Sequence, residues 1–304
     1  MSSTRQLRGY HAQLHGPARD EHHGSHLLIY AAVGSGLVDD ALFSASRLGA
    51  GADVTVFGDP ETTSRCAEKA PPHIQCVDAI AQLEHAQWFG CESCARLQGA
   101  QPLRTNPWYS TGKPSGGHNR LVKIGSLLLA PYHTSFFLDA DVVPCLPLRS
   151  LRRLMAAPGG SSIWDAADLL AATNRMYNDY ARTSRYPGHQ KLGGTPVAWP
   201  YLNSGVILFR PDRAPVQAAL RQWLCGYCDG AQKDQLPGED QPYFNAALYR
   251  GASMHHLRVI ALPPTWNPRN WDMVIPRITN HSKGCCKGSA YLDHGCRKPN
   301  SSAI

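Results

Sequence analysis

The first quarter of the chain alternates between apolar runs and helical patterns, and this alternation constrains the fold more than any other feature. Residues 26–33 (HLLIYAAV) form an apolar run that ends at a glycine-rich turn, and residues 53–57 (DVTVF) form a second run. Residues 38–48 between them have a helical pattern, and a third helix–strand pair follows at 65–70 and 73–77. This β-α-β-α-β order predicts an α/β fold, in which a mainly parallel sheet is covered by helices on both faces.

The length and composition suit one large domain. The chain has 304 residues, of which 43% are hydrophobic and 17% charged, so it can bury a sizeable core. We expect a single domain at 25–290, between a polar N-terminal tail at 1–24 and a C-terminal tail at 291–304. Residues 89–118 and an aromatic-rich insert at about 157–200 are expected to be irregular.

Charge and hydropathy limit the kinds of molecule that the chain is expected to bind. The net charge is +7, but the basic residues are scattered, which argues against nucleic acid. No stretch has the length and apolarity of a membrane span. The first 25 residues are polar and His-rich, without the apolar core of a signal peptide. As it stands the chain is expected in the cytoplasm, and in the Golgi lumen if an N-terminal signal anchor is missing.

Ten cysteines include two C-x-x-C pairs, Cys91/Cys94 and Cys225/Cys228. Four thiolates could hold a tetrahedral zinc ion, but compact zinc modules place their pairs much closer together than these. Disulfides or buried thiols are therefore favoured over zinc. The cysteine count leaves the redox compartment open.

Two carboxylates follow a buried-type strand in the middle of the chain. Asp139 and Asp141 come directly after the apolar run 134–138 (TSFFL), at the strand end where open α/β sheets bind ligands. Two oxygen ligands one residue apart suit Mg²⁺ or Mn²⁺. The alternative is that they only solubilise a strand end or cap the next helix. The helix expected at 119–130 precedes this strand and carries Arg120 and Lys123 on one face.

Two enzyme classes use such a D-x-D pair. In haloacid-dehalogenase-type phosphatases the first aspartate, here Asp139, is a nucleophile. That chemistry needs a downstream acidic pair, and neither Asp165/Asp168 nor Glu239/Asp240 has its form. In metal-dependent sugar transferases the pair holds the cation that bridges a nucleoside diphosphate.

Four further motifs occur downstream in a fixed order. They are N-S-G-V at 203–206, D-Q-x-x-x-N at 240–245, T-W-N at 265–267 and H-x-x-G-x-x-K at 281–287. Together with D-x-D they resemble the GT-A sugar-nucleotide transferases, most closely the glycogenin-like retaining group, glycosyltransferase family eight. The resemblance runs from about residue 26 to 290 and implies a GT-A (Rossmann-like) fold.

The resemblance also implies a role for each matching residue. The metal, Mn²⁺ or Mg²⁺, would be bound by Asp139, Asp141 and His281. The reacting face would carry Asp240 and Gln241. The donor would be bound by Lys123, Arg120, Asp139, Asn203, Gly205, Gly284 and Lys287. The two glycines let the backbone approach the ligand.

The implied reaction transfers a sugar from a nucleoside diphosphate, with a UDP-hexose or UDP-pentose as the expected donor. The acceptor, whether glycan, protein, lipid or polyol, cannot be read from the motifs. Retention is expected, although a carboxylate at a helix start, such as Asp240, is also where inverting enzymes keep a base. Two alternatives stay open: a phosphohydrolase, and a non-catalytic protein that binds sugar nucleotides or glycans. Individually, His281, Lys123, Asp240 and Asn203 could each be purely structural.

Overall fold

The computed structural model describes residues 27–33, 35–46, 53–98, 116–130, 134–140, 142–144, 166–173, 200–232, 240–263 and 292–294. The strands are β1 (Leu27–Ala31), β2 (Asp53–Gly58), β3 (Ile74–Asp78), β4 (Ser135–Asp139), β5 (Val142–Pro144), β6 (Leu169–Thr173), β7 (Leu202–Phe209), β8 (Val259–Leu262) and β9 (Leu292–His294). The helices are α2 (Ser35–Ser46), α3 (Pro60–Lys69), α4 (Ala79–His85), the 3₁₀ turn η1 (Gln87–Gly90), α5 (Glu92–Gln98), α6 (Gly116–Leu128), α11 (Ala214–Gln232) and α12 (Gln241–His255).

Seven of these strands form one mixed sheet, in the order β3-β2-β1-β4-β7-β6-β8. Strand β1 is parallel to β2 and β4, and β2 is parallel to β3. Strand β7 is antiparallel to both of its neighbours, β4 and β6, and β8 is parallel to β6. Because β7 alone runs against the others in this sheet, its N-terminal end lies at the edge where β1 and β4 end. The predicted mixed, mainly parallel sheet is confirmed.

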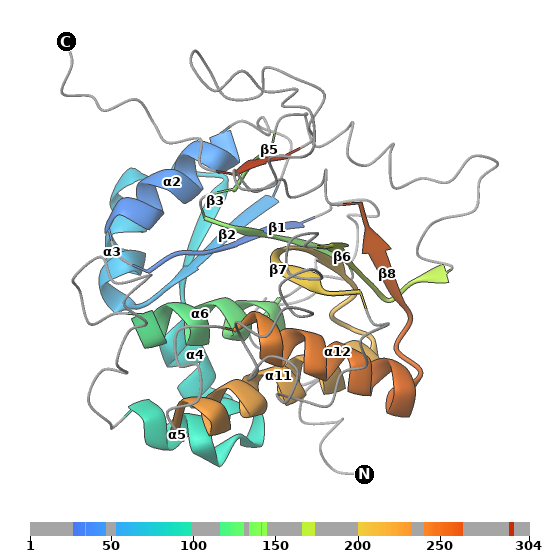
Figure 1. The fold of residues 1–304 in the computed structure, drawn as a ribbon. Coiled ribbons are helices and arrows are strands. Elements are labelled where there is room, and N and C mark those ends of the chain that lie inside the picture. The colour runs from blue at the N-terminus through green and yellow to red at the C-terminus, as the bar shows by residue number, and fades with distance from the viewer. Residues whose placement is uncertain are drawn as a thin grey trace, which may run out of the picture.

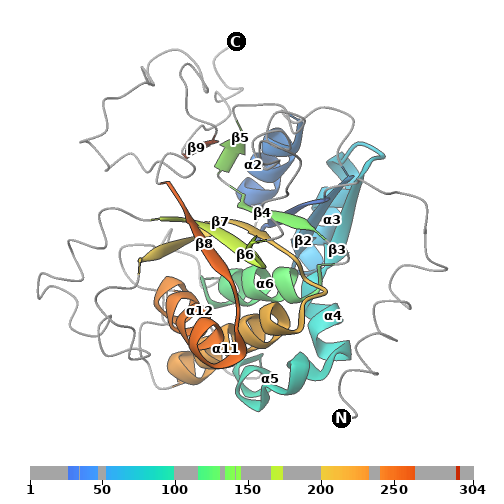
Figure 2. The same cartoon turned by 90° about the vertical axis from the view of Figure 1, so that its right-hand side faces the viewer.

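Helices cover both faces of this sheet (Figures 1 and 2). Side chains alternate across each strand. Leu28 and Tyr30 of β1 accordingly pack with α2 and α3 on one face, whereas Ile29 packs with α4, α6, α11 and α12 on the other. None of the helices in the described ranges is both long and apolar enough to cross a membrane.

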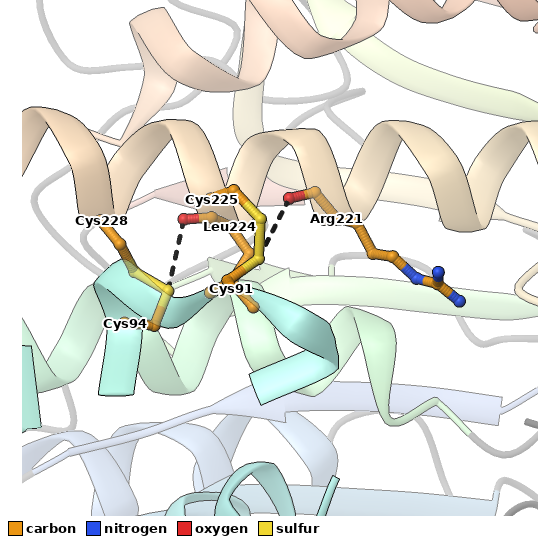
Figure 3. The surroundings of a disulfide bond; sticks show 6 residues. All are labelled: Cys91, Cys94, Arg221, Leu224, Cys225 and Cys228. Carbon is orange, nitrogen blue, oxygen red and sulfur yellow. Dashed lines mark hydrogen bonds between the residues drawn. A yellow bond between two sulfur atoms is a disulfide. The ribbon is translucent and has the colours of Figure 1, made fainter. Parts of the chain in front are cut away.

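The described part of the chain contains three disulfides, one next to α3 and two between α5 and α11. Cys66–Cys76 joins α3 to β3. Cys91–Cys225 and Cys94–Cys228, called here the α5–α11 disulfides, join the start of α5 to α11, with Cα–Cα distances of 5.2 and 5.1 Å (Figure 3). All six cysteines in the described part of the chain are paired, so the two C-x-x-C motifs are bonded to each other and leave no thiolate for zinc.

The α5–α11 disulfides pack closely against the backbone of α11. The sulfur of Cys91 lies 3.9 Å from the carbonyl oxygen of Arg221, and that of Cys94 lies 3.7 Å from the carbonyl oxygen of Leu224. A disulfide sulfur carries no hydrogen, so these are packing contacts. They bring the start of α5 into direct contact with α11.

Two segments that the sequence predicts to be irregular contain regular secondary structure. Helix α5 and the start of α6 lie within 89–118, and β6 lies within the aromatic-rich insert 157–200. Strand β6 (LLAAT) is rich in leucine and alanine and has one β-branched residue, so its sequence pattern is weak. It forms because β7 and β8 pair with it on either side and all but its last residue are buried.

Candidate active site

The candidate site lies where β4 ends and β7 begins. Leu138 pairs with Val206, which brings Asp139 beside Gly205. A Cβ atom placed on Gly205 would lie 2.5 Å from Asp139 Oδ2 and 3.0 Å from Asn203 Oδ1. Any side chain at position 205 would displace this carboxylate. The Asn203 side chain is held by the Gly205 backbone N–H, which donates to Oδ1 at 2.7 Å.

Lys123 of α6 connects the two halves of the site. It is 4% exposed, and its ammonium group lies 2.9 Å from Asp139 Oδ1, 3.2 Å from Asp240 Oδ2 and 3.0 Å from Ser204 Oγ. An ammonium has three N–H donors, and here they meet three acceptors. The lysine is therefore not solvated on a helix face, and it joins the D-x-D motif to the D-Q motif.

Asp240 occupies the N-cap position of α12 but does not cap the helix. Its carboxylate makes no capping hydrogen bond. It turns instead toward Arg120, whose Nε lies 3.4 Å from Oδ1, and toward Ser204, whose hydroxyl donates to Oδ2 at 2.8 Å. Since a capping aspartate would bond the first turn of its own helix, the role of Asp240 is more than that of a helix-terminal charge.

The charges around Asp240 keep it ionised. Burial alone would raise the pKa of its carboxyl, but the nearby charges of Lys123 and Arg120, with hydrogen bonds from Ser204 and Lys123, outweigh burial and hold the pKa well below its ordinary range. Asp240 is 4% exposed. The site thus contains a buried, permanent carboxylate.

The backbone of Asp240 is held from behind by α11. The indole Nε1–H of Trp223 donates to the Asp240 carbonyl at 3.0 Å, and the Trp223 ring packs on Phe244 with centroids 4.6 Å apart. Trp223 is fully buried. The same helix carries Cys225 and Cys228, so the α5–α11 disulfides anchor the element that supports Asp240.

Two buried amides next to this charged cluster have unused donors. Asn203 is 1% and Gln241 9% exposed, and Asn203 Nδ2 and Gln241 Nε2 have no hydrogen-bond partner among the described residues. Buried donors are almost always paired, so these two amide N–H groups are available to a polar ligand that binds here. Sugar hydroxyls are acceptors that such amides could bind.

The structure brings together most of the residues that the motifs single out. The residues that lie at this edge of the sheet are Arg120, Lys123, Asp139, Asn203, Gly205 and Asp240, and Gln241 directly follows Asp240 at the start of α12. Asp141, His281, Gly284 and Lys287 lie outside the described residues. Strand β9 does return to this region, because His294 pairs with Val142, the residue that directly follows Asp141.

A divalent cation is compatible with the part of the site that can be described. Asp139 offers a carboxylate oxygen, the hard ligand that Mn²⁺ and Mg²⁺ prefer. Among the described residues no cluster of three or more metal-binding side chains occurs, and the other two predicted ligands, Asp141 and His281, lie beyond them. Of the three predicted ligands, Asp139 alone lies within the described ranges, and its carboxylate suits the ion.

Ser204 and Trp223 belong to the site although the motifs give them no role. Ser204 lies inside N-S-G-V, between two residues that were singled out, and accepts from Lys123 while donating to Asp240. Its position between these two residues is the one sequence feature that indicates a role for Ser204 in the site. Trp223 has no such signal, because nothing in an apolar helix pattern shows that its N–H reaches the start of the next helix.

Comparison with known proteins gives a fold and no family. The chain resembles the apo crystal structure of mouse xyloside xylosyltransferase 1, with a TM-score of 0.51 and 15% identity over 90% of this chain and 99% of that one. Two further structures have a TM-score of 0.49 and 15% identity: the bifunctional glycosyltransferase WbbM, over 82% of this chain and 41% of that one, and the galactosyltransferase LgtC with donor and acceptor sugar analogues, over 88% and 86%.

No protein-family profile matches this chain, and no curated protein sequence is similar to it. At 15% identity the likeness to the mouse enzyme shows a shared GT-A-type fold, as the motifs predicted. It does not extend to the activity or to membership of glycosyltransferase family eight.

Proposed function

We propose that this chain is a metal-dependent glycosyltransferase, which moves a sugar from a nucleoside diphosphate donor to an acceptor. The donor is a UDP-hexose or UDP-pentose, and the acceptor is a glycan, protein, lipid or polyol. The enzyme belongs with the glycogenin-like retaining group. These finer assignments rest on the motif resemblance, and the geometry supports the reaction class.

One observation carries the proposal. Lys123, a single buried cation, joins the aspartate of the D-x-D motif to the aspartate of the D-Q motif. Beside it lie two buried amides whose N–H groups have no partner within the described part of the chain. These groups lie on a GT-A-type sheet, at the edge where ligands bind in open α/β folds.

Each group has a role that follows from its chemistry. Asp139, with Asp141 and His281, would hold Mn²⁺ or Mg²⁺, which when bound neutralises charge on the diphosphate. Lys123 and Arg120 place positive charge beside the bond that breaks, where the leaving diphosphate becomes more negative. Asn203 and Gln241 would donate to sugar hydroxyls and orient the ring. Gly284 and Lys287 would contact the donor phosphates.

The surroundings of Asp240 favour retention over inversion. A general base needs an available lone pair and a pKa near the working pH. Arg120, Lys123 and Ser204 occupy the Asp240 carboxylate, and its pKa is lowered by the nearby charges of Lys123 and Arg120 against the opposing effect of burial. Asp240 is thus suited to fix charge and orient the sugar, and unsuited to remove a proton from the acceptor.

The first experiment is a thermal-shift panel. UDP, GDP, ADP and CDP are each added with Mn²⁺ or with EDTA. We expect one nucleotide, UDP, to raise the melting temperature with Mn²⁺ and not with EDTA, because binding to the native state stabilises it. Asp139→Asn should abolish this shift. Asp53→Asn, at the opposite end of the sheet and exposed, is the matched control.

The outcomes separate the alternatives. Equal stabilisation by UDP in EDTA would overturn the metal assignment. No stabilisation by any nucleotide, with phosphate-ester hydrolysis that depends on Asp139, would favour the phosphohydrolase. Metal-dependent UDP binding without turnover of any UDP-sugar on an acceptor array would favour the non-catalytic binding protein.

We further propose that the chain folds in an oxidising compartment, such as the Golgi lumen. Three disulfides, two of them buried at the α5–α11 contact, are typical of secretory proteins and rare in the cytosol. The α5–α11 disulfides each span 134 residues, so loss of both should lower the free energy of unfolding by about 7 kcal/mol. Loss of one should cost about 2–3 kcal/mol, because the other still closes the long loop.

Peptide mapping of protein secreted from eukaryotic cells checks the disulfides from which this compartment is inferred. We expect Cys91–Cys225 and Cys94–Cys228 peptides under non-reducing digestion. Alkylation of all four cysteines in the native, unreduced protein would contradict it.

A further inference from the structure

A chain of buried hydroxyl groups leads from the centre of the sheet to the D-x-D motif. Tyr30 of β1 and Ser44 of α2 are both fully buried in a cluster that is otherwise apolar. The Tyr30 hydroxyl lies 2.8 Å from Ser44 Oγ, and the Ser44 hydroxyl lies 2.6 Å from the Val142 carbonyl oxygen. These contacts span 14 and 98 residues along the sequence.

The direction of both hydrogen bonds follows from proton counting. A carbonyl oxygen can only accept, so the single proton of Ser44 goes to Val142. The Tyr30 hydroxyl must then donate to Ser44. Burial raises the pKa of Tyr30, against the smaller lowering effect of its hydrogen bond with Ser44, so the phenol keeps its proton.

The acceptor at the end of this chain is the residue that directly follows Asp141. Strand β4 holds Asp139 on one side of the motif through its pairing with β1 and β7. Val142, at the start of β5, lies on the other side, and α2 contacts β5. The Ser44 hydrogen bond therefore fixes the second end of the short segment whose first end is fixed by the sheet.

We propose that Ser44, supported by Tyr30, is a positioning residue for the D-x-D motif: it fixes the Val142 end of the short segment that follows Asp139 and thereby raises the affinity for the divalent cation. The inference rests on the proposed function. A phenylalanine and an alanine would fill the same space without burying two hydroxyls. The polar pair is therefore kept for what it holds, which is the Val142 carbonyl.

Three variants separate positioning from stability. Ser44→Ala breaks the bond to Val142 and leaves Tyr30 without a partner. Tyr30→Phe leaves the Ser44–Val142 bond intact. The double variant Tyr30→Phe/Ser44→Ala removes both hydroxyls, so it regains stability relative to Ser44→Ala, because no orphaned phenol remains. Thr55→Val is the control, since it removes a buried hydroxyl from the middle of the neighbouring strand β2.

The readout is Mn²⁺ binding, measured by calorimetry at a fixed, saturating concentration of UDP, with melting temperature recorded in parallel. We expect the apparent Kd for Mn²⁺ to rise about fivefold in Ser44→Ala and equally in the double variant, about twofold or less in Tyr30→Phe, and not at all in Thr55→Val. UDP affinity at saturating Mn²⁺ should be restored in every variant.

The failure modes are distinct. If the wild-type protein shows no Mn²⁺-dependent binding of UDP, the proposed function fails. If the wild type binds and the double variant binds Mn²⁺ equally well, the positioning role fails, whatever the melting temperatures. A Mn²⁺ affinity that tracks melting temperature across all variants would also overturn it, because that result describes a purely structural hydrogen bond.

Discussion

Two carboxylates, Asp168 and Asp240, are buried almost equally but lie in different surroundings. Asp168 is 2% exposed and Asp240 4%, and each is held by two cationic side chains. Arg258 and Arg213 bind Asp168 at the edge of the sheet where β6 and β8 begin. Lys123 and Arg120 bind Asp240 at the opposite edge, where β4 ends.

The partners of Asp168 connect the strands around it. Arg258 donates to it from Nε at 3.1 Å, from a terminal guanidinium nitrogen at 2.9 Å and from its backbone N–H at 3.1 Å. The Asp168 backbone in turn bonds Arg258 and Arg210, so the ends of β6, β7 and β8 are tied together. This cluster has the form of a structural anchor.

The partners of Asp240 are shared with other groups. Lys123 divides its donors among Asp139, Asp240 and Ser204. The amide N–H groups of Asn203 and Gln241 alongside are not bonded to any residue in the described ranges. Burial of a carboxylate with two cations therefore does not identify a site. Shared cations and unused donors do, because they leave the arrangement incomplete until a ligand is added.

The largest expected effect tests which carboxylate takes part in the reaction. Asp240→Asn should reduce release of UDP from UDP-sugars by about 100-fold or more, because the permanent charge beside the reacting sugar is lost. Asp168→Asn should leave turnover per folded molecule unchanged. The measurement is UDP release with a panel of UDP-hexoses and UDP-xylose. A loss of turnover in Asp168→Asn and not in Asp240→Asn would show that Asp168 takes part in the reaction and Asp240 does not.

The next effect is on stability, where the ranking should invert. Asp168→Asn should lower the free energy of unfolding by about 2–3 kcal/mol, since charge-assisted hydrogen bonds that tie three strand ends are weakened. Urea unfolding measures this. Asp39→Asn is the matched control: Asp39 also binds two cations, Arg65 and Lys69, but it is more exposed, and its loss should cost less than about 1 kcal/mol. Equal costs would show that the Asp168 cluster is not an anchor.

Removal of Lys123 tests whether the cation shared by Asp139 and Asp240 contributes to UDP binding. Lys123→Met keeps the length of the side chain and leaves Asp139 and Asp240 without their common partner. We expect UDP to bind about tenfold more weakly in Mn²⁺, as measured by calorimetry. Lys69→Met, which removes an exposed lysine from an ion pair, should bind UDP normally. Unchanged binding in Lys123→Met would remove the central connection of the site.

The smallest effect is on pH dependence. The hydrogen bonds from Arg258 lower the pKa of Asp168 more than burial raises it. A carboxyl whose folded pKa is below its unfolded value of about 3.9 stabilises the protein above that value, and the contribution declines as pH falls through the folded pKa. The urea midpoint of the wild type should therefore fall more steeply below pH 5 than that of Asp168→Asn. Parallel profiles would contradict this.

Much of the fold and the core of the site could be predicted from sequence because both depend on local patterns. The apolar run that ends at Asp139 and the apolar run that begins at residues 203–206 place those motifs at strand ends. The strand β6 could not be predicted, because only its neighbours in the sheet make its short alanine-rich segment a strand. The pairing of Cys91 with Cys225 and Cys94 with Cys228 depends on how α5 packs on α11, which spacing does not contain.

The hydroxyl contacts of Ser44 and Ser204 escaped prediction for a related reason. Each serine bonds a group far away in the sequence: Ser44 reaches 98 residues to Val142, and Ser204 reaches 36 residues to Asp240. A lone serine in a helix or strand pattern carries no mark of such a partner. The charged residues, by contrast, stood in motifs whose chemistry was readable.

Crystals grown with UDP and Mn²⁺, with anomalous diffraction collected at the manganese edge, show whether Asp139 binds the metal and the nucleotide. We expect one anomalous peak within coordination distance of the Asp139 carboxylate, with the diphosphate on the same ion and the uridine at the edge of the sheet where β1 and β4 end. An anomalous peak or a nucleotide elsewhere on the molecule, with Lys123 still bridging an unliganded Asp139 and Asp240, would contradict it.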